Sequence, residues 1–258
     1  MTIDALPVVR AADAPVATAT QMAEIDRLAS AELGISLEAL MENASRQIAA
    51  ATRVVFGDRA LQDVVAVTGT GNNGGDALGA LRYLHQAGAR VEAYLVTARE
   101  GLRPLARQQC DSLERLGVPI HETTSATDWT LVDRLKRADV VIDGLLGYGA
   151  RGAPRGEVLR MITVVVAGGY GRVVAVDIPS GLDPDTGTRL GDMRATPVQA
   201  ALTVTLGLPK PGLLADVARS HVGELLVADI GIPAEPFARL GIEMRGLFAR
   251  GSLVRVLF

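Results

Sequence analysis

The sequence predicts an α/β fold: a three-layer α/β/α sandwich around a mostly parallel sheet. Short apolar runs rich in valine recur at residues 64–67, 140–142 and 173–176, and such runs are typical of strands buried on both faces. Segments with helical spacing of apolar residues separate them, without a linker or a repeat. We therefore expect one domain over residues 18–258, preceded by a flexible arm of residues 1–17 that is rich in alanine and proline.

Two helices are expected before the first strand. Thr18 and Gln21 have the spacing of a capping box, and apolar residues with helical spacing follow them as far as Gly34, which ends the first helix. Ser36 is placed to cap the second helix, whose apolar stripe extends to Ala51.

A strand, a glycine-rich loop and a helix come next. Residues 64–68 form the strand, residues 69–75 the loop and residues 76–88 the helix, with glycines spaced as G-x-G-x-x-G. Glycine lets the backbone approach an anion closely, and the N–H groups at a helix start point at it, so this unit favours a Rossmann-like phosphate site. The pattern also fits a plain turn, and it lacks the lysine of a P-loop. Asn72 and Asn73 can cap the helix, bind a ligand or offer oxygens to a cation.

The rest of the chain continues the alternation of strands and helices. Strands are expected at residues 91–96, 138–143, 173–177, 201–206 and 225–229, with an edge strand at 253–258. Helices are expected at residues 104–116, 129–136, 157–166 and 213–219.

Polar residues gather at the carboxyl ends of three of these strands. Ligands of parallel sheets bind in the crevice outside those ends, where Asn72 and Asn73, Asp143, and Asp177 with Ser180 are placed. Their amide, carboxylate and hydroxyl oxygens suit an alkali or alkaline-earth cation rather than a transition metal. Taken singly, an aspartate at a strand end is usually a helix cap or turn former, whereas two of them beside two glycine-rich loops favour a site.

The composition excludes several classes of function. A net charge of -3 and 3% aromatic residues argue against a nucleic-acid partner. Cys110, the single cysteine, leaves no internal disulfide, and the three histidines lack metal-ligand spacing. The sequence contains no apolar run that could span a bilayer and no signal-peptide layout, so we expect a cytoplasmic protein without a membrane partner.

A family resemblance rests on several motifs in order. Residues 69–76, GTGNNGGD, resemble the glycine/asparagine signature of the NAD(P)H-hydrate epimerases, the YjeF N-terminal domain family. Further segments that resemble the family are residues 41–44, 143–149, 176–183 and 208–213. The resemblance extends from about Thr18 to Pro233. Departures are Thr70 where proline is usual, Ala77 where glycine is usual and Leu146 where an aromatic residue is usual.

The resemblance implies an isomerase of nicotinamide nucleotide repair. Its substrate would be NADH or NADPH hydrated at C6 of the nicotinamide ring, and the enzyme would interconvert the R and S hydrates. A separate dehydratase would then restore the S form. Bifunctional relatives carry that dehydratase as a C-terminal domain, which we expect this chain to lack. The resemblance also implies a homodimer.

The resemblance assigns the site residues as well. It implies a potassium ion (K+) held by Asn73, Asp143 and Ser180. Asp177 would contact the hydrated ring, and its carboxyl group is our candidate to protonate the leaving hydroxyl and deprotonate the incoming water. Two loops would hold the dinucleotide: Asn72, Asn73, Gly74, Gly75 and Asp76 in the first, and Gly147, Tyr148, Gly149, Ala150, Arg151, Gly152 and Ala153 in the second.

Two other classes of function stay open. Members of this fold also occur as non-catalytic dimerisation scaffolds, as in an mRNA-decapping enhancer, but loss of the asparagine pair or the strand-end aspartates would favour that function and both are present. A Rossmann-type dehydrogenase would need an acidic residue after the second strand, and residues 96–99 offer none at the strand end. Lys210 would face either a phosphate or the solvent.

Overall fold

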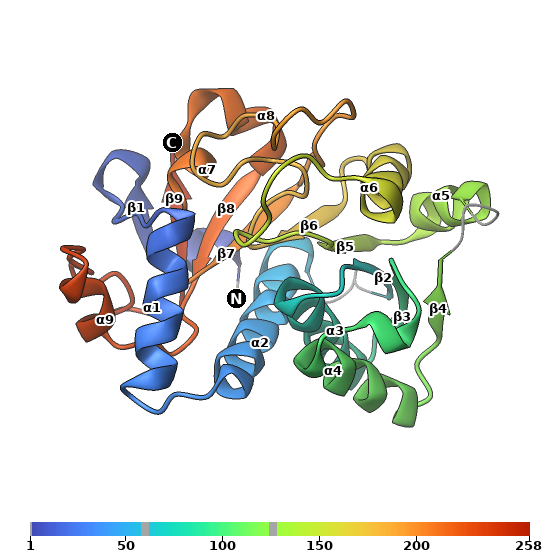
Figure 1. The fold of residues 1–258 in the computed structure, drawn as a ribbon, viewed down its shortest axis with the longest axis horizontal. Coiled ribbons are helices and arrows are strands. Elements are labelled where there is room, and N and C mark those ends of the chain that lie inside the picture. The colour runs from blue at the N-terminus through green and yellow to red at the C-terminus, as the bar shows by residue number, and fades with distance from the viewer. Residues whose placement is uncertain (1, 58–61, 124–127) are drawn as a thin grey trace.

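A mostly parallel sheet crosses the molecule between two layers of helices (Figure 1). The computed structural model describes residues 2–57, 62–123 and 128–258, and these form nine strands in the order β1-β9-β8-β7-β6-β5-β2-β3-β4. Neighbouring strands run parallel except β8 and β9, which confirms the predicted fold class. The strands are β1 (Val8–Arg10), β2 (Asp63–Thr68), β3 (Arg90–Leu95), β4 (Ile120–Glu122), β5 (Val140–Gly144), β6 (Val173–Val176), β7 (Leu202–Leu206), β8 (Glu224–Ala228) and β9 (Leu253–Leu257).

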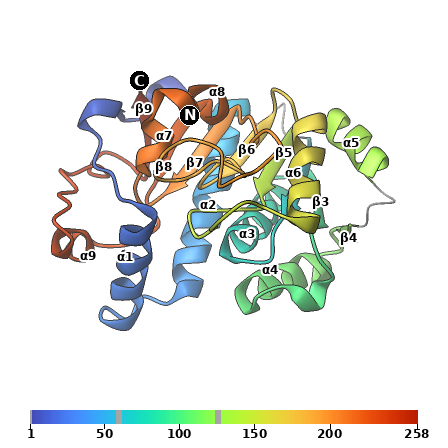
Figure 2. The ribbon, with the colours of Figure 1, turned by 45° about the horizontal axis from the view of Figure 1, so that its top comes forward.

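Helices cover both faces of the sheet. They are α1 (Ala19–Ala31), α2 (Leu37–Phe56), α3 (Asn72–Gln86), α4 (Pro104–Arg115), α5 (Asp128–Arg137), α6 (Gly156–Gly168), α7 (Pro211–Leu214), α8 (Arg219–Val222) and α9 (Ala234–Arg239). The short α9 lies beside α1 at one end of the molecule in both views (Figure 2). Among the described residues, the helices are all too short or too polar to cross a membrane.

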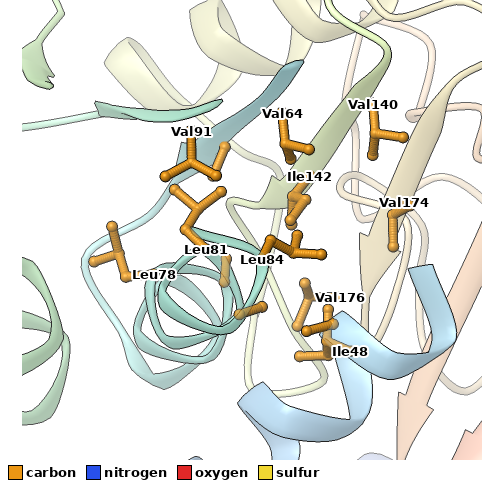
Figure 3. Close-up of a cluster of buried hydrophobic side chains, with 14 of the residues drawn as sticks. Ile48, Val64, Leu78, Leu81, Leu84, Val91, Val140, Ile142, Val174 and Val176 are labelled. Carbon is orange, nitrogen blue, oxygen red and sulfur yellow. The ribbon is translucent and has the colours of Figure 1, made fainter. Parts of the chain in front are cut away.

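Alternate residues of β2 pack into different layers. Val64 and Ala66 belong to the cluster with α2, α3 and α4, whereas Val65 and Val67 pack against α5 and α6. Figure 3 shows leucines of α3, among them Leu81, directed at the strands. Because β2 is buried on both faces, its sequence is a continuous apolar run rather than an alternating one.

Both predicted caps at the start of the chain are confirmed. The Thr18 hydroxyl accepts from the Gln21 N–H at 3.2 Å, and the Gln21 side chain accepts from the Thr18 N–H at 2.9 Å. The Ser36 hydroxyl accepts from the Ala39 N–H at 3.2 Å and starts α2. These caps hold α1 and α2 where they reach the carboxyl ends of the central strands.

Several predicted boundaries are wrong. The helix α3 begins at Asn72 rather than Asp76, because Gly71 is its N-cap residue and Gly74 and Gly75 are part of the helix. The helix expected over residues 213–219 is split into α7 and α8, since Ala215 has an extended backbone. The sequence analysis missed β4 and α9. The segment Leu253–Leu257 is a strand but not an edge strand, because β1 covers it.

Residues before α1 take part in the sheet. Val8 pairs with Arg255 and Arg10 with Leu257 in the β1–β9 ladder, and Leu6 is buried in the core. The expected flexibility of residues 1–17 stays a prediction, and residue 1 lies outside the described part of the chain.

The order of strands places a crevice beside β2. The chain passes from β2 to β3 and β4 on one side, and then returns to β5 on the other side of β2. Connections after β2 and β5 therefore diverge over opposite sides of this pair. Such a switch point is where open α/β sheets bind their ligands.

Candidate functional site

An open cleft of about 560 Å³ lies at the carboxyl ends of β2, β5 and β6, with α1 and α2 contributing to its wall. Its lining includes residues 69–73, Asp76, residues 145–151 and Asp177. The structure thus brings most of the predicted dinucleotide-binding residues together. Gly152 instead lines a smaller neighbouring cavity of about 260 Å³.

Glycines allow two backbone loops to touch at the floor of the cleft. A Cβ on Gly69 would lie 2.1 Å from the carbonyl oxygen of Leu145, and one on Gly74 would lie 2.2 Å from the carbonyl oxygen of Gly69. Gly75 packs between Met41 and Ala106. Gly74 and Gly75 therefore serve contacts within the chain, and the sequence analysis did not foresee this.

The start of α3 is open toward the cleft. Its N-cap residue, Gly71, has no side chain to bond the first N–H groups, and the neighbouring Asn72 and Asn73 line the cleft. Exposed N–H groups and the positive end of the helix dipole attract an anion. This part of the site can hold a phosphate without any lysine in the loop.

Asp143 and Ser180 form a buried pair behind the cleft wall. The Ser180 hydroxyl donates to Asp143 Oδ1 at 2.7 Å, and the Ser180 N–H donates to Oδ2 at 2.9 Å. Leu146 N–H donates to the Ser180 hydroxyl at 3.0 Å, which ties the pair to the loop after β5. Burial raises the pKa of the Asp143 carboxyl to about 6, although the hydrogen bonds from Ser180 act to lower it.

Asn73 lies against the same loop. A Cβ on Gly147 would come within 2.8 Å of Asn73 Oδ1, so only glycine leaves room for this side chain. Among the described residues, Asn73 Nδ2 has no hydrogen-bond partner although it is buried. The amide and the carboxylate offer oxygens, and no described group of histidine, cysteine or carboxylate residues is arranged to hold a metal ion. This donor set fits a hard monovalent cation better than a transition metal.

Asp177 is anchored by Lys210, a residue that the sequence analysis expected to face either a phosphate or the solvent. Lys210 is fully buried, and its ammonium group lies 2.5 Å from Asp177 Oδ1. The N–H of Tyr148 donates to Asp177 Oδ2 at 3.0 Å. Asp177 has φ 65°, a left-handed backbone that turns the chain just after β6. The ion pair thus holds a carboxylate at the cleft in a fixed orientation.

Asp26 of α1 belongs to the same polar network, although no sequence motif indicated it. The Tyr148 hydroxyl donates a hydrogen bond to the Asp26 carboxylate, and Lys210 Nζ lies 5.4 Å from the centre of the Tyr148 ring. Burial raises the pKa of Asp26, with the bond from Tyr148 acting against it. Only the packing of α1 over the cleft reveals this residue.

Comparisons with known proteins identify the family of this chain. Residues 37–212 match the family described as "YjeF-related protein N-terminus". The chain belongs to the YjeF N-terminal family. It is 37% identical over 93% of its length to a protein of Dehalogenimonas lykanthroporepellens named NAD(P)H-hydrate epimerase, covering 91% of that protein.

One further relative and one solved structure add to the family match. A protein of Moorella thermoacetica named bifunctional NAD(P)H-hydrate repair enzyme Nnr is 37% identical over 90% of this chain, which spans only 43% of that protein. The crystal structure of the yeast protein YNL200c superposes with a TM-score of 0.76 over 93% of this chain and 99% of its own. At 23% identity, this likeness shows that the two share a fold.

The loop contact of this YjeF domain generates a stability prediction. Gly74→Ala forces a Cβ against the Gly69 carbonyl, so we expect a loss of about 3 kcal/mol in the free energy of unfolding. Gly71→Ala is the matched control, because its Cβ would have no atom within 4 Å, and it should lose less than about 1 kcal/mol. Urea unfolding of both variants measures the difference, and equal losses would contradict the loop contact.

Proposed function

We propose that the chain is an NAD(P)H-hydrate epimerase, an isomerase that interconverts the R and S forms of C6-hydrated NADH and NADPH. The observation that carries the proposal is the cleft at the β2/β5 switch point, which joins an open helix start to a carboxylate held by Lys210. The name and the near-complete overlap of the Dehalogenimonas relative support it.

The substrate spans the cleft from phosphate to ring. Asn72 to Asp76 hold the pyrophosphate at the start of α3. The donors are the N–H groups ahead of Gly75, because the Gly75 N–H already donates to the Gly71 carbonyl. Gly147 to Ala153 form the facing loop, and Asp177 contacts the hydrated ring. Support comes from the lining of the cleft, which includes residues of both loops and Asp177.

The reaction needs proton transfer at the C6 hydroxyl. The ring nitrogen expels the hydroxyl group as water and leaves a planar iminium ion, to which water adds on the other face. Asp177 takes part in this proton transfer, and its negative charge favours the cationic ring. The backbone of Tyr148 and the ammonium of Lys210 keep the Asp177 carboxylate oriented toward the substrate.

Asn73, Asp143 and Ser180 hold a potassium ion. When bound, the cation would supply positive charge that balances the buried Asp143 carboxylate. The oxygens of the Asp143–Ser180 pair and the position of Asn73 Oδ1 against Gly147 of the loop after β5 support this assignment. Through Leu146 and Gly147, the same residues position the loop that faces the substrate.

The enzyme works as a cytoplasmic homodimer with a separate dehydratase as its functional partner. The bifunctional name of the Moorella relative supports the link between the two activities. The asparagine pair and strand-end aspartates, all present, weigh against a purely non-catalytic scaffold.

Replacement of Asp177 tests the proposed reaction. Asp177→Asn keeps the shape of the side chain but removes its proton-transfer capacity, so epimerisation should fall about 10²–10⁴-fold with binding largely retained. The measurement is chromatographic exchange between R and S NADHX at saturating substrate, with the uncatalysed exchange subtracted. Exchange at the wild-type rate would remove Asp177 from the mechanism, whereas a change in affinity alone would assign it to ring positioning.

The cation proposal predicts a dependence on pH. Without a cation, the pKa of Asp143 is raised from 3.8 to about 6 in the folded state. Between pH 3.8 and about pH 6, the folded state therefore binds more protons than the unfolded state. Ionisation of Asp143 therefore lowers stability as pH rises through this window, by up to about 3 kcal/mol. Potassium binds the ionised form, so it should raise the melting temperature more at about pH 8 than at about pH 5.

The control for this experiment is choline chloride at equal ionic strength. Asp143→Asn should show neither the loss of stability across that pH window nor the potassium effect. Equal stabilisation by potassium at both pH values would contradict a cation on Asp143.

A further inference from the structure

Asp76 differs from the other acidic residues around the cleft. It lies one turn into α3 and is only 7% exposed, yet it contributes to the lining of the cleft. Its backbone carbonyl accepts a hydrogen bond from Ser45 at 3.1 Å. Its carboxyl group, in contrast, has no hydrogen-bond or ion-pair partner among the residues that the structure describes. A buried polar group that opens only to the cleft is suited to bind a group of the ligand.

The neighbouring carboxylates are each satisfied by the protein. Asp177 pairs with Lys210, Asp143 accepts from Ser180, and Asp26 accepts from Tyr148. Such bonds stabilise a carboxylate in its place. Asp76 has no such bond among the described residues, so none of these residues compensates a negative charge there.

The charged groups around Asp76 come from several elements. The negative charges of Asp177, after β6, and Asp26, on α1, act on it, and burial acts more strongly still. Lys210 donates to Asp177, and Arg103, ahead of α4, also lines the cleft but is not among the groups whose charge shifts the pKa of Asp76. Together, burial and these carboxylates raise the pKa of Asp76 well above its usual value.

We propose that Asp76 is the general acid of the epimerisation and donates the proton to the C6 hydroxyl group as the C6–O bond breaks. This assignment rests on the proposed function and adds to it a division of labour between two carboxyl groups. Asp76 is the neutral donor, and Asp177 is the carboxylate that accepts the proton of the incoming water. Pairs of carboxyl groups in unlike surroundings commonly divide the acid and base roles in this way.

The step balances without a further reactant. The C6–O bonding pair leaves with the oxygen, which takes the Asp76 proton to become water, while the N1 lone pair forms the second N1–C6 bond. Water then adds to the opposite face of C6, the N1–C6 π pair returns to nitrogen, and the released proton goes to Asp177. Proton exchange with solvent restores both carboxyl groups, so the net reaction is the exchange of one epimer for the other.

The test compares Asp76→Asn with the wild-type full chain. We expect kcat for exchange of R and S NADPHX to fall about 10²–10⁴-fold, with KM changed less than about threefold. Since the acid form of Asp76 is the active one, wild-type kcat should fall as pH rises through its raised pKa. That alkaline limb should be absent from Asp76→Asn. Asp111→Asn, on the outer side of α4 beside Arg107, is the control and should retain both kcat and the limb.

An infrared difference spectrum gives a readout that does not depend on activity. Wild type minus Asp76→Asn should show the carbonyl band of a neutral carboxyl group at neutral pH. If Asp76→Asn does not fold, Asp76→Ser serves the same comparison.

The outcomes separate the two proposals. Wild-type kcat in the Asp76 variants, or a band of an ionised carboxylate at neutral pH, overturns the role of Asp76 while the epimerase function stands. A wild-type protein that does not exchange the epimers overturns the proposed function and the acid role together, even with a neutral carboxyl band present.

Discussion

Contact between two backbone loops is the constraint on which this site depends. Gly69 lies against the Leu145 carbonyl, and the Gly69 carbonyl lies against Gly74 of α3. The Gly69 N–H also donates to the Gly144 carbonyl at 3.1 Å. Because glycines have no side chains at these contacts, the start of α3 and the loop after β5 can pack directly against the loop after β2 at the bottom of the cleft. The helix start, the buried Asp143 and the loop that carries Tyr148 then meet around the same cleft.

Buried carboxyl groups are the second feature that shapes the site. Among the described residues, Asp26, Asp76 and Asp177 line the cleft, and Asp143 lies behind its wall. Lys210 pairs with Asp177, Ser180 bonds Asp143 and Tyr148 bonds Asp26, whereas the Asp76 carboxyl group has no such partner among these residues. Burial raises the pKa of Asp26, Asp76 and Asp143, and hydrogen bonds from Tyr148 and Ser180 oppose this at Asp26 and Asp143. A site of oxygen ligands and carboxyl groups can thus combine anion binding, cation binding and proton transfer within one crevice.

Much of the fold and of the cleft was predictable from local patterns. Valine runs identify strands buried on both faces, and Thr18 and Ser36 identify two helix starts, because these signals depend on neighbouring residues alone. Long-range contacts were not predictable in this way. The sequence does not reveal that Lys210 is buried beside Asp177. Likewise, the surroundings of Asp26 and Asp76 are formed only when α1 and α3 pack over the sheet. The three-residue β4 has no apolar pattern to reveal it.

The β1–β9 ladder has a consequence for the order of synthesis and folding. Val8 pairs with Arg255, so the segment that contains Val8 must wait for one that is synthesised much later. Meanwhile β2, β3 and β5 can already associate on the ribosome, since their partners lie closer in sequence. In chain order the sheet can therefore grow from β2, β3 and the edge strand β4 toward β8, and the nascent chain carries an unpaired strand edge at β8 until residues 253–257 have emerged.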